Sequence, residues 1–415
     1  MKLTDTEQRM IDGKDGKAVA MAMTILSKLG QIYGAEEMIP ISQVHIDSSA
    51  YKAIGEAGLE FAEKLADSGA RFCVPTTLNP ASRDIERWQE FRIPADFAEK
   101  SRRLEQAYLH MGATPTWTCA PYLYGIIPRF GQQVAWGESN AINFVNSVIG
   151  ARTARYGDFA EICAAVTGRA PNFSLHLSQN RAGEVLLRLQ DSRLINWDDD
   201  SLYPLIGYIA GSAARGRIPV IDGIPNSVTS DHLKGLSAAA ASSGSVALFH
   251  ILGVTPEAAT YQDAFQGRAP LEIIDISEAE MQKARQDMST TEEGKVDLVI
   301  IGCPHASFPE IAQLIRVLDS RKISPEVEFW VQTNRIVSRW LKEAGLLAPL
   351  ETSGVKVIND TCIFSWPIEN WGFRLAVTNS GKFAHYTPGM LQAQVVFGSL
   401  GRCVEAAVTG EVSKI

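Results

Sequence analysis

The stretch Val296-Asp-Leu-Val-Ile-Ile-Gly-Cys-Pro-His305 places a short apolar run directly before a turn that carries a cysteine. A run of this length, rich in Val and Ile, predicts a buried strand. Gly302 allows a turn that a bulkier residue would resist, and Pro304 has no backbone donor with which to continue a ladder. The strand is therefore expected to end near Gly302 and to present Cys303 in the loop that follows.

The same order of segments, namely an apolar run, a loop of small or polar residues and a helical stretch, recurs along the chain. Further apolar runs are Arg71–Pro75, Thr114–Thr118, Ile218–Ile221, Val246–Leu252, Val327–Val331 and Val355–Ile358. One helix is predicted from a capping box at Thr4 and Glu7, and a second from the apolar face between Val19 and Tyr33. Strands that alternate with helices predict an α/β fold with mostly parallel sheets, whose ligands bind at the carboxyl ends of the strands.

The six cysteines of the chain fall into two groups. The group expected to pack in the core as small hydrophobic residues is Cys73, Cys163 and Cys403. The other group, in which each cysteine follows an apolar run, is Cys119, Cys303 and Cys362. These three either pack in the same way or supply three thiolates to a metal cluster that keeps one metal position open. No Cys-x-x-Cys pair is present, so a zinc ribbon or a ferredoxin pattern is not supported.

The composition is that of an ordinary globular protein with an acidic balance. Of the 415 residues, 46% are hydrophobic and 21% are charged, and the formal net charge is −8. No block of Lys and Arg is present, which argues against nucleic acid or a membrane surface as the main partner. The first residues lack the apolar core of a signal peptide, and six cysteines in a long chain suggest reduced thiols, so a cytoplasmic location is expected.

A series of short motifs, in order along essentially the whole chain, resembles the aconitase X family, and specifically its large subunit. The motifs are Ile54-Gly-Glu-Ala-Gly-Leu-Glu-Phe, Val74-Pro-Thr-Thr-Leu-Asn-Pro, Thr118-Cys-Ala-Pro-Tyr, Trp136-Gly-Glu-Ser-Asn-Ala, Asn146-Ser-Val-Ile-Gly-Ala-Arg-Thr, Gly302-Cys-Pro-His, Asp360-Thr-Cys and Lys382-Phe-Ala-His-Tyr. One such motif alone would be unspecific, whereas the ordered set is highly specific.

The resemblance implies an aconitase-like fold of three α/β subdomains, with mostly parallel sheets around a central cluster site, over residues 1–415. It implies an iron–sulfur cluster, 4Fe–4S or 2Fe–2S, that is held by Cys119, Cys303 and Cys362 and keeps one iron position open. The substrate contacts that it implies are Ser48, Ser49, Ala50, Asn79, Pro80, Glu138, Ser139 and Lys382. From the residues alone, the Glu138-Ser139 pair also suits a helix start, which is compatible with substrate contact, and a lysine such as Lys382 is more often a solvated surface residue.

The reactions known in the family remove water from small hydroxy acids, namely cis-3-hydroxy-L-proline in bacteria and mevalonate 5-phosphate in archaea. The loop Ser48-Ser49-Ala50 departs from archaeal members, which look like Gly-Val-Ser at this place. This favours cis-3-hydroxy-L-proline as substrate, with Δ1-pyrroline-2-carboxylate as product. The alternative substrate is (R)-5-phosphomevalonate, which would give trans-anhydromevalonate 5-phosphate. A non-catalytic RNA-binding role, disfavoured by the acidic balance, and a zinc-dependent or cluster-free hydrolase are the remaining hypotheses.

The resemblance also implies a partner. Removal of water requires loss of a proton next to a carboxylate and departure of hydroxide from the neighbouring carbon, which an iron with an open position assists. The chain stops shortly after Gly389-Met-Leu-Gln-Ala-Gln-Val, before the swivelling domain that supplies a serine base in aconitase-like enzymes. A separate small subunit that brings the general base is therefore expected.

His305 suits either hydrogen-bonded structure or a place beside the cluster.

Overall fold

The computed structural model describes residues 1–368 and 371–414, which form two compact units. The first unit ends at Ala182 and the second begins at Gly183. The three larger sheets are parallel throughout, and their strands are joined through helices, which confirms the predicted α/β fold. Among the described residues, no helix is both long enough and apolar enough to cross a membrane.

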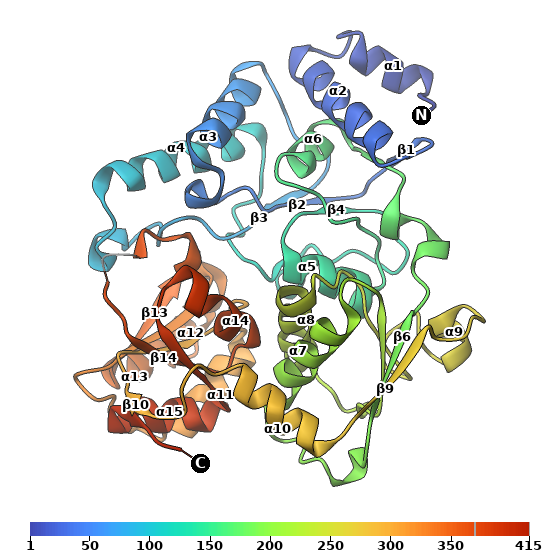
Figure 1. The fold of residues 1–415 in the computed structure, drawn as a ribbon. Coiled ribbons are helices and arrows are strands. Elements are labelled where there is room, and N and C mark those ends of the chain that lie inside the picture. Colours follow the sequence, from blue (N-terminus) through green and yellow to red (C-terminus); the bar gives the residue numbers. More distant parts are fainter. Residues whose placement is uncertain (369–370, 415) are drawn as a thin grey trace. The chain divides into compact units, whose positions relative to one another are not determined.

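The first unit is built around a three-stranded parallel sheet. Its helices and strands are α1 (Asp5–Ile11), α2 (Lys17–Ile32), β1 (Met38–Pro40), β2 (Val44–Ile46), α3 (Tyr51–Asp67), β3 (Thr76–Leu78), α4 (Ala95–Met111), β4 (Ala135–Trp136), α5 (Ser139–Phe144), α6 (Ala160–Thr167) and β5 (Arg169–Pro171). The sheet has the order β3-β2-β4, and β1 pairs antiparallel with β5. Helices α2, α3, α4 and α6 lie on one side of the sheet and α5 lies on the other (Figure 1).

Local sequence accounts for the first helices and for part of the core. Thr4 and Glu7 form the predicted capping box at the start of α1. The predicted apolar face of α2 is confirmed, because Met23 and Leu26 are fully buried and α2 packs against α6. Cys163 of α6 is also fully buried, as expected for a small hydrophobic residue.

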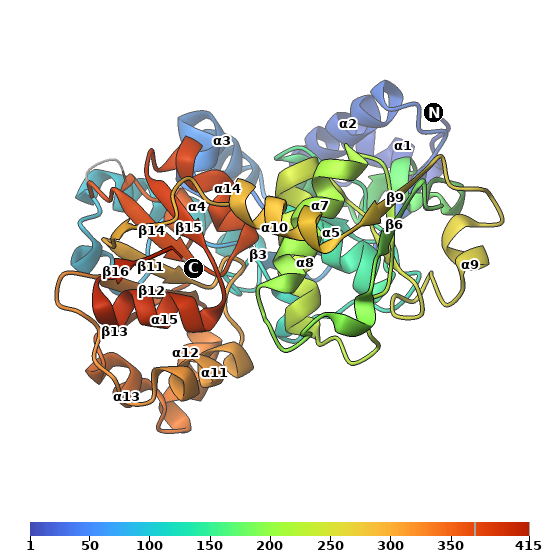
Figure 2. The ribbon, with the colours of Figure 1, turned by 60° about the horizontal axis from the view of Figure 1, so that its bottom comes forward.

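The second unit begins with a four-stranded parallel sheet in the order β8-β7-β6-β9. Its elements are β6 (Val185–Leu189), α7 (Leu202–Ala214), β7 (Pro219–Asp222), α8 (Ser230–Gly244), β8 (His250–Ile251), α9 (Tyr261–Phe265), β9 (Glu272–Ile276) and α10 (Glu278–Asp287). Helices α7 and α8 pack side by side next to this sheet (Figures 1 and 2). Gly207 and Gly244 allow this close packing, because an added Cβ would meet backbone atoms of the facing helix at 2.3 and 1.8 Å.

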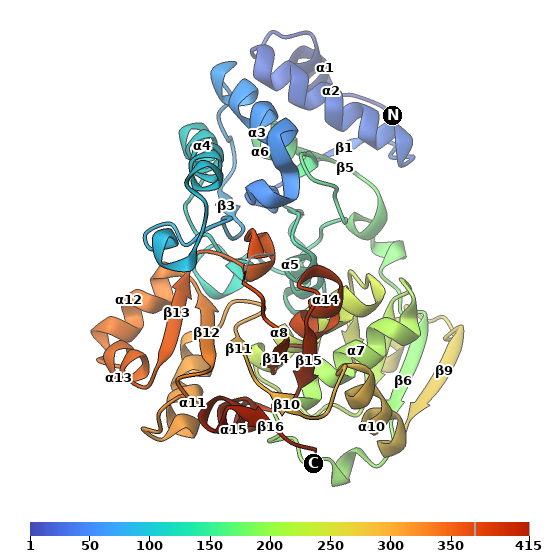
Figure 3. The same ribbon diagram turned by 60° about the vertical axis from the view of Figure 1, so that its left-hand side comes forward.

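The rest of the second unit is a five-stranded parallel sheet in the order β13-β12-β11-β14-β15 (Figure 3). Its elements are β10 (Gly294–Lys295), β11 (Leu298–Ile301), α11 (Phe308–Leu318), β12 (Glu328–Thr333), α12 (Arg335–Glu343), α13 (Leu347–Thr352), β13 (Val355–Asn359), β14 (Leu375–Thr378), α14 (Gly381–Met390), β15 (Gln394–Phe397), α15 (Leu400–Thr409) and β16 (Glu411–Val412). Helices α11 and α15 lie on one face of the sheet and α14 on the other (Figure 2), where α14 also packs against α7 and α8.

Two of the predicted strands are wrong. The run Arg71–Pro75 is not a strand, because the partner strand β2 pairs with the next residues, Thr76–Leu78. Cys73, expected in the core, is consequently exposed. The run Thr114–Thr118 makes a single bridge to β3 and is then broken by Trp117, whose φ of 45° lies in the left-handed region.

Candidate functional site

The polar loops of the first unit gather where its strand order reverses. The chain passes from β2 to β3 on one side and then places β4 on the other side of β2. Such a reversal opens a crevice at the carboxyl ends of the strands, where open α/β sheets bind ligands. The loops that begin there are Ser48-Ser49-Ala50, Asn79-Pro80 and Glu138-Ser139. The structure thus brings to one sheet edge all the predicted substrate contacts of this unit.

Hydrogen bonds join the loops after β2 and β3. Ser49 Oγ donates to the backbone oxygen of Asn79 at 2.7 Å. The Asn79 side chain donates in turn to the carboxylate of Asp47. Ser48 and Ser49 are 1% and 0% exposed, whereas Asn79 is half-buried. The two serines therefore shape the loop, and Asn79 links it to Asp47.

Glu138 forms the start of α5 and connects this edge to Cys119. Its carboxylate accepts a hydrogen bond from the backbone of Ala141 at 2.7 Å, so the helix-start interpretation is confirmed. Asn140 Nδ2 donates to the same carboxylate and, at 2.9 Å, to the backbone oxygen of Cys119. Ser139, the first residue of α5, is half-buried. The first predicted cysteine ligand thus lies beside two predicted substrate contacts.

His45 of β2 contributes a neutral ring to this region. The side chain is fully buried, and its Nδ1 lies 2.8 Å from Thr77 Oγ1. Burial lowers the pKa of His45 to about 4, in spite of the opposing effects of Glu138 and Asn79. The imidazole therefore carries no charge near neutral pH.

Glu161 of α6 reaches the Ser48 loop from the side of the sheet on which α2, α3, α4 and α6 lie (Figure 1). Its Oε1 accepts hydrogen bonds from the Ser48 backbone at 3.3 Å and from Ser48 Oγ at 3.0 Å. Tyr108 donates to the backbone oxygen of the same serine at 2.9 Å. Gly137 packs against Glu161, since an added Cβ would lie 3.3 Å from Cδ of that residue. Burial raises the pKa of Glu161 from 4.5 to about 7, so the acid is largely protonated below neutral pH.

Replacing Glu161 with glutamine is expected to remove a pH dependence of stability. Folding raises the pKa of Glu161 from 4.5 to about 7, so the folded protein binds more protons than the unfolded chain between these values. This contribution to stability is fully present below the unfolded pKa and is lost as the pH rises through the folded pKa, by about 3 kcal/mol in all. Glutamine keeps the acceptor for Ser48 and cannot ionise.

Urea titrations of the parent and of Glu161→Gln measure this effect. The two proteins should have nearly equal free energies of unfolding at about pH 4, and the variant should be the more stable by about 3 kcal/mol at about pH 8. A difference that does not change between the two pH values would contradict the assignment.

In the second unit, Cys303 and Lys382 lie at the corresponding reversal of the five-stranded sheet. The chain passes from β11 to β12 and β13 on one side and then places β14 on the other side of β11. Cys303 follows β11, and Ser380 follows β14. Ser380 Oγ donates to the backbone oxygen of Cys303 and accepts from Phe383 at the start of α14, whose second residue is Lys382. The structure thus places these two predicted site residues at one switch point.

The turn before Cys303 requires glycine, as the sequence predicts. Gly302 has a φ of 94°, in the region that side chains disfavour. An added Cβ would lie 2.1 Å from the backbone oxygen of Gln332, which no small adjustment relieves. The loop of Cys303 is therefore in direct backbone contact with the end of β12.

Cys362 follows β13, two strands away from β11 in the same sheet. Its loop is fixed by Asp360, whose carboxylate accepts hydrogen bonds from the backbone and the side chain of Arg335 at 2.9 and 2.7 Å. Thr361 accepts a hydrogen bond from the ring of His305 at 2.8 Å. The loops of Cys303 and Cys362 are thus connected through His305.

Each predicted cysteine ligand is half-buried and has its backbone oxygen hydrogen-bonded by a nearby side chain. The donors are Asn140 for Cys119, Ser380 for Cys303 and Ser365 for Cys362. Cys119 belongs to the first unit and the other two cysteines to the second. Within residues 1–368 and 371–414, no group of three His, Cys, Asp or Glu side chains is assembled around a metal position. Ligation by the three cysteines therefore stays a prediction.

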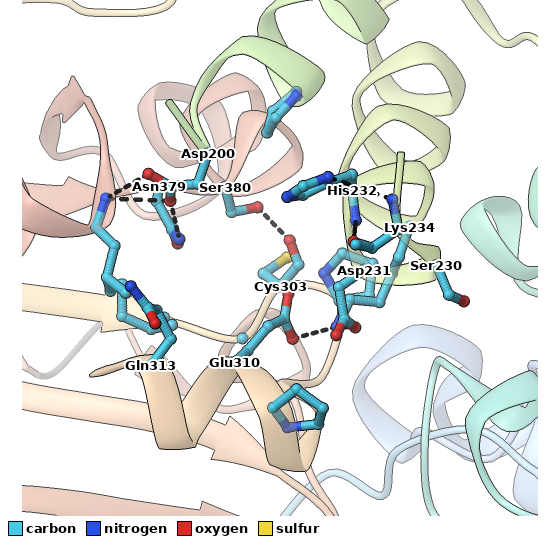
Figure 4. A pocket seen from close by; sticks show the side chains of 18 of the residues that line it. Asp200, Ser230, Asp231, His232, Lys234, Cys303, Glu310, Gln313, Asn379 and Ser380 are labelled. Atoms are coloured by element: carbon cyan, nitrogen blue, oxygen red, sulfur yellow. Dashed lines mark hydrogen bonds and ion pairs between the residues drawn. The ribbon is translucent and has the colours of Figure 1, made fainter. Parts of the chain in front are cut away.

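A pocket of about 570 Å³ in the second unit borders Cys303 (Figure 4). Asp200 and His232 contribute to its wall from the part of the unit that contains α7 and α8. Cys303, Asn379 and Ser380 contribute from the switch point of the five-stranded sheet. The carboxyl edge of that sheet is therefore accessible to a small molecule at Cys303.

Lys234 of α8 lies in the wall of this pocket and is almost completely buried, with 2% of its side chain exposed. Its Nζ lies 3.2 Å from the carboxylate of Asp231, contacts that of Glu310, and donates to the backbone oxygen of His305 at 3.1 Å. Burial favours the neutral amine, but the two carboxylates outweigh it and raise the pKa of Lys234. The side chain is therefore a charged anchor for the Cys303 loop.

Sequence reasoning missed four residues that shape these sites, namely Asp47, Asn140, Glu161 and Lys234. Asp47 and Asn140 directly adjoin predicted contacts, so their polar side chains at strand ends were an available signal. Glu161 directly precedes the apolar run Ile162–Val166, so the only signal in the sequence was an acid next to a helix that is expected to be buried. Nothing in the local sequence distinguishes Lys234 from a surface lysine.

Three models of one family match the chain in succession. They are described as Aconitase X first domain, second domain and third domain, and they match residues 1–179, 183–286 and 296–409. The first match ends close to the boundary between the two units of the structure. Together the three matches cover nearly the whole chain.

Named relatives and a solved structure are similar over the same length. The cis-3-hydroxy-L-proline dehydratase of Pseudomonas aeruginosa is 42% identical over 99% of this chain and 70% of its own length. The phosphomevalonate dehydratase large subunit of Methanothermobacter thermautotrophicus is 39% identical over 95% of this chain and 96% of its own. The crystal structure of Thermococcus kodakaraensis aconitase X in its holo-form superposes with a TM-score of 0.88 at 32% identity, covering 98% of this chain and 100% of that one.

Proposed function

Since the chain belongs to the aconitase X family, we propose that it is the large subunit of a hydro-lyase that converts cis-3-hydroxy-L-proline to Δ1-pyrroline-2-carboxylate. The relatives of Pseudomonas aeruginosa and Hypocrea jecorina that are named cis-3-hydroxy-L-proline dehydratase support this, at 42% and 41% identity. The observation that carries the choice of substrate is the charge of the sheet edge in the first unit. The stretches 44–50, 76–82 and 135–141, which form that edge, contain no Lys or Arg.

This edge suits a substrate with an amine better than one with a phosphate. Asp47 and Glu138 supply carboxylates, His45 is neutral, and Asn79 is an uncharged amide. The ring amine of hydroxyproline is protonated near neutral pH and is attracted by carboxylates. A phosphate dianion would be repelled by them, and it usually requires several cationic or backbone donors.

The donor set of Cys119, Cys303 and Cys362 suits an iron–sulfur cluster. The three thiols are half-buried, and the backbone of each cysteine is held by a hydrogen bond from a neighbouring side chain. Thiolates are the usual protein ligands of such clusters. Bound by three of them, the cluster would supply a Lewis acid for the departing hydroxide.

The side chains of the chain itself would bind and orient the substrate. Lys382 and Ser139 would hold the substrate carboxylate, where negative charge grows as the adjacent proton leaves, and loss of one such donor costs roughly 3–4 kcal/mol. Glu138 would receive the ring amine at a carboxylate that is already fixed by Ala141. Glu161 would keep the loop at Ser48 in shape through its two hydrogen bonds.

The general base is proposed to come from a separate small subunit, which completes the active site. Relatives from archaea carry the words "large subunit" in their names, which supports a partner of this kind. A cytoplasmic location, where thiols stay reduced, suits the proposed cysteine ligands.

Dehydration of (R)-5-phosphomevalonate is the second candidate. It is supported by two relatives named phosphomevalonate dehydratase large subunit, which are 39% and 36% identical to this chain. The carboxylates at the sheet edge argue against it, as described above.

Anaerobic assays of the protein with its small subunit test the proposal. After reconstitution with iron and sulfide, cis-3-hydroxy-L-proline should be consumed with formation of Δ1-pyrroline-2-carboxylate, while (R)-5-phosphomevalonate should be unchanged. Turnover of the phosphoester alone would replace the first candidate by the second. A protein that binds zinc and no iron would reject both.

A further inference from the structure

We propose that His305 is a positioning residue that fixes the loops of Cys303 and Cys362 relative to each other, so that the two thiols act as one preformed donor pair. The inference rests on the proposed function, in which both cysteines bind iron. It concerns His305 itself, which is not one of the proposed ligands.

The strands that lead to Cys303 and Cys362 are not neighbours in the sheet. Cys303 follows β11 and Cys362 follows β13, and β12 lies between these strands. Neighbouring strands lie about 4.8 Å apart, so the ends of β11 and β13 are separated by about 10 Å and share no ladder hydrogen bonds. The register of both strands on β12 fixes their ends, but no ladder hydrogen bond joins the two cysteine loops directly.

A side-chain hydrogen bond crosses the end of β12 and joins the two loops. His305 lies two residues after Cys303, and its Nε2 is 2.8 Å from the backbone oxygen of Thr361, which directly precedes Cys362. A carbonyl oxygen only accepts, so Nε2 carries the hydrogen and donates. His305 is 1% exposed and Thr361 is 0% exposed, so water does not compete for this bond.

The backbone of His305 is held as firmly as its ring. Lys234 donates to its backbone oxygen at 3.1 Å, and Ala306 donates to the backbone oxygen of Gln332 at 2.9 Å. Gly302 brings the start of the same loop against Gln332 as well. The ring therefore extends from a backbone that is held in place, and its Nε2 donates to the backbone oxygen of Thr361.

This bond is shorter than a second one to the same backbone oxygen of Thr361. The nearest substitute is Gln332 Nε2, which lies 3.5 Å from the same oxygen of Thr361, at the limit for a hydrogen bond. Loss of the imidazole donor would remove the direct side-chain link between the two loops, while Asp360 would still hold the Cys362 loop to Arg335. Groups that orient metal ligands typically change metal affinity by about 10- to 100-fold when they are removed.

Three variants separate this role from packing. His305→Leu keeps most of the side-chain volume and has no donor. His305→Gln places an Nε2 donor at a similar reach and should restore the bond. His250→Leu makes the same substitution at another buried histidine of the second unit, on β8, and serves as the control. Urea titration checks that each variant is folded.

The first measurement is the rate at which each reconstituted protein loses iron to an excess of chelator under anaerobic conditions. His305→Leu should lose iron about 10- to 100-fold faster than the parent, while His305→Gln and His250→Leu should stay close to it. Equal rates for His305→Leu and the parent would overturn the inference. Equal acceleration in His305→Leu and His305→Gln would also overturn it, because the donor would then not be the cause.

The second measurement needs no cluster. In a Cys119→Ser background, metal-free protein is titrated with phenylarsine oxide, whose arsenic bonds to two thiols with release of water. His305→Leu should bind the arsenical about 10- to 100-fold more weakly than the background protein, and His305→Gln should not. Equal binding would overturn the inference. If the parent takes up no iron and sulfide but the arsenical still distinguishes the variants, the proposed function fails and the positioning role stands.

Discussion

Replacing Cys303 with serine is expected to lower kcat/KM for cis-3-hydroxy-L-proline by at least about a thousandfold, because a Lewis acid supplies several kcal/mol of charge stabilisation and each 1.4 kcal/mol is a factor of ten. Serine is similar in shape, so the turn at Gly302 and the hydrogen bond from Ser380 to the backbone of residue 303 should persist. Anaerobic kinetics together with iron and sulfide analysis measure the effect.

Cys73→Ser is the matched control for this experiment. Cys73 is an exposed cysteine of the first unit and has no proposed role at the cluster. Its replacement should leave both the iron content and kcat/KM within about twofold of the parent, as surface substitutions usually change stability by less than about 0.5 kcal/mol. A Cys303→Ser protein that keeps its iron and its activity would remove Cys303 from the ligand set.

Replacing Lys234 with methionine is expected to destabilise the second unit by about 3–5 kcal/mol, because it leaves two buried or half-buried carboxylates without their cation. Lys234 is 2% exposed, and its partners Asp231 and Glu310 are 20% and 34% exposed. The same change removes the donor to the backbone oxygen of His305. A unit of this size should show a fall in Tm on the order of 10 °C in calorimetry.

Lys356→Met provides the comparison for Lys234→Met. Lys356 forms an ion pair with Glu328 at 2.6 Å, and the two side chains are 47% and 34% exposed. Exposed pairs of this kind contribute about 0–1 kcal/mol, so this substitution should shift Tm by only a few degrees. If the two methionine variants lower Tm equally, the buried ion pairs of Lys234 contribute no more to stability than the exposed pair of Lys356.

The local pattern of the chain was sufficient to predict several strands and the loops that follow them. The run before Cys303 forms β11, and the run before Cys362 forms β13, because continuous apolar residues with a turn behind them have few alternatives to a buried parallel strand. The helix start at Glu138 followed in the same way from the preference of an acid for the N-terminus of a helix.

Features that depend on the pairing of strands distant in the sequence could not be predicted from local sequence patterns. The strand at residue 76 was placed five residues too early because its position is set by β2, which lies about 30 residues away in the sequence. The reversals of strand order, which gather Ser49, Asn79 and Glu138 at one edge, are also long-range properties. The same holds for Glu161, which bonds to Ser48, and for Lys234, which reaches Glu310 and His305 besides its neighbour Asp231.

The hydrogen bonds to the backbone oxygens of Cys119, Cys303 and Cys362 have a consequence for damage and repair. Because the donors are side chains of the protein itself, each of these peptide groups is oriented by the polypeptide alone. Loss of the proposed iron–sulfur cluster to oxygen should then leave a folded polypeptide, and return of iron and sulfide should restore the cluster without a refolding step.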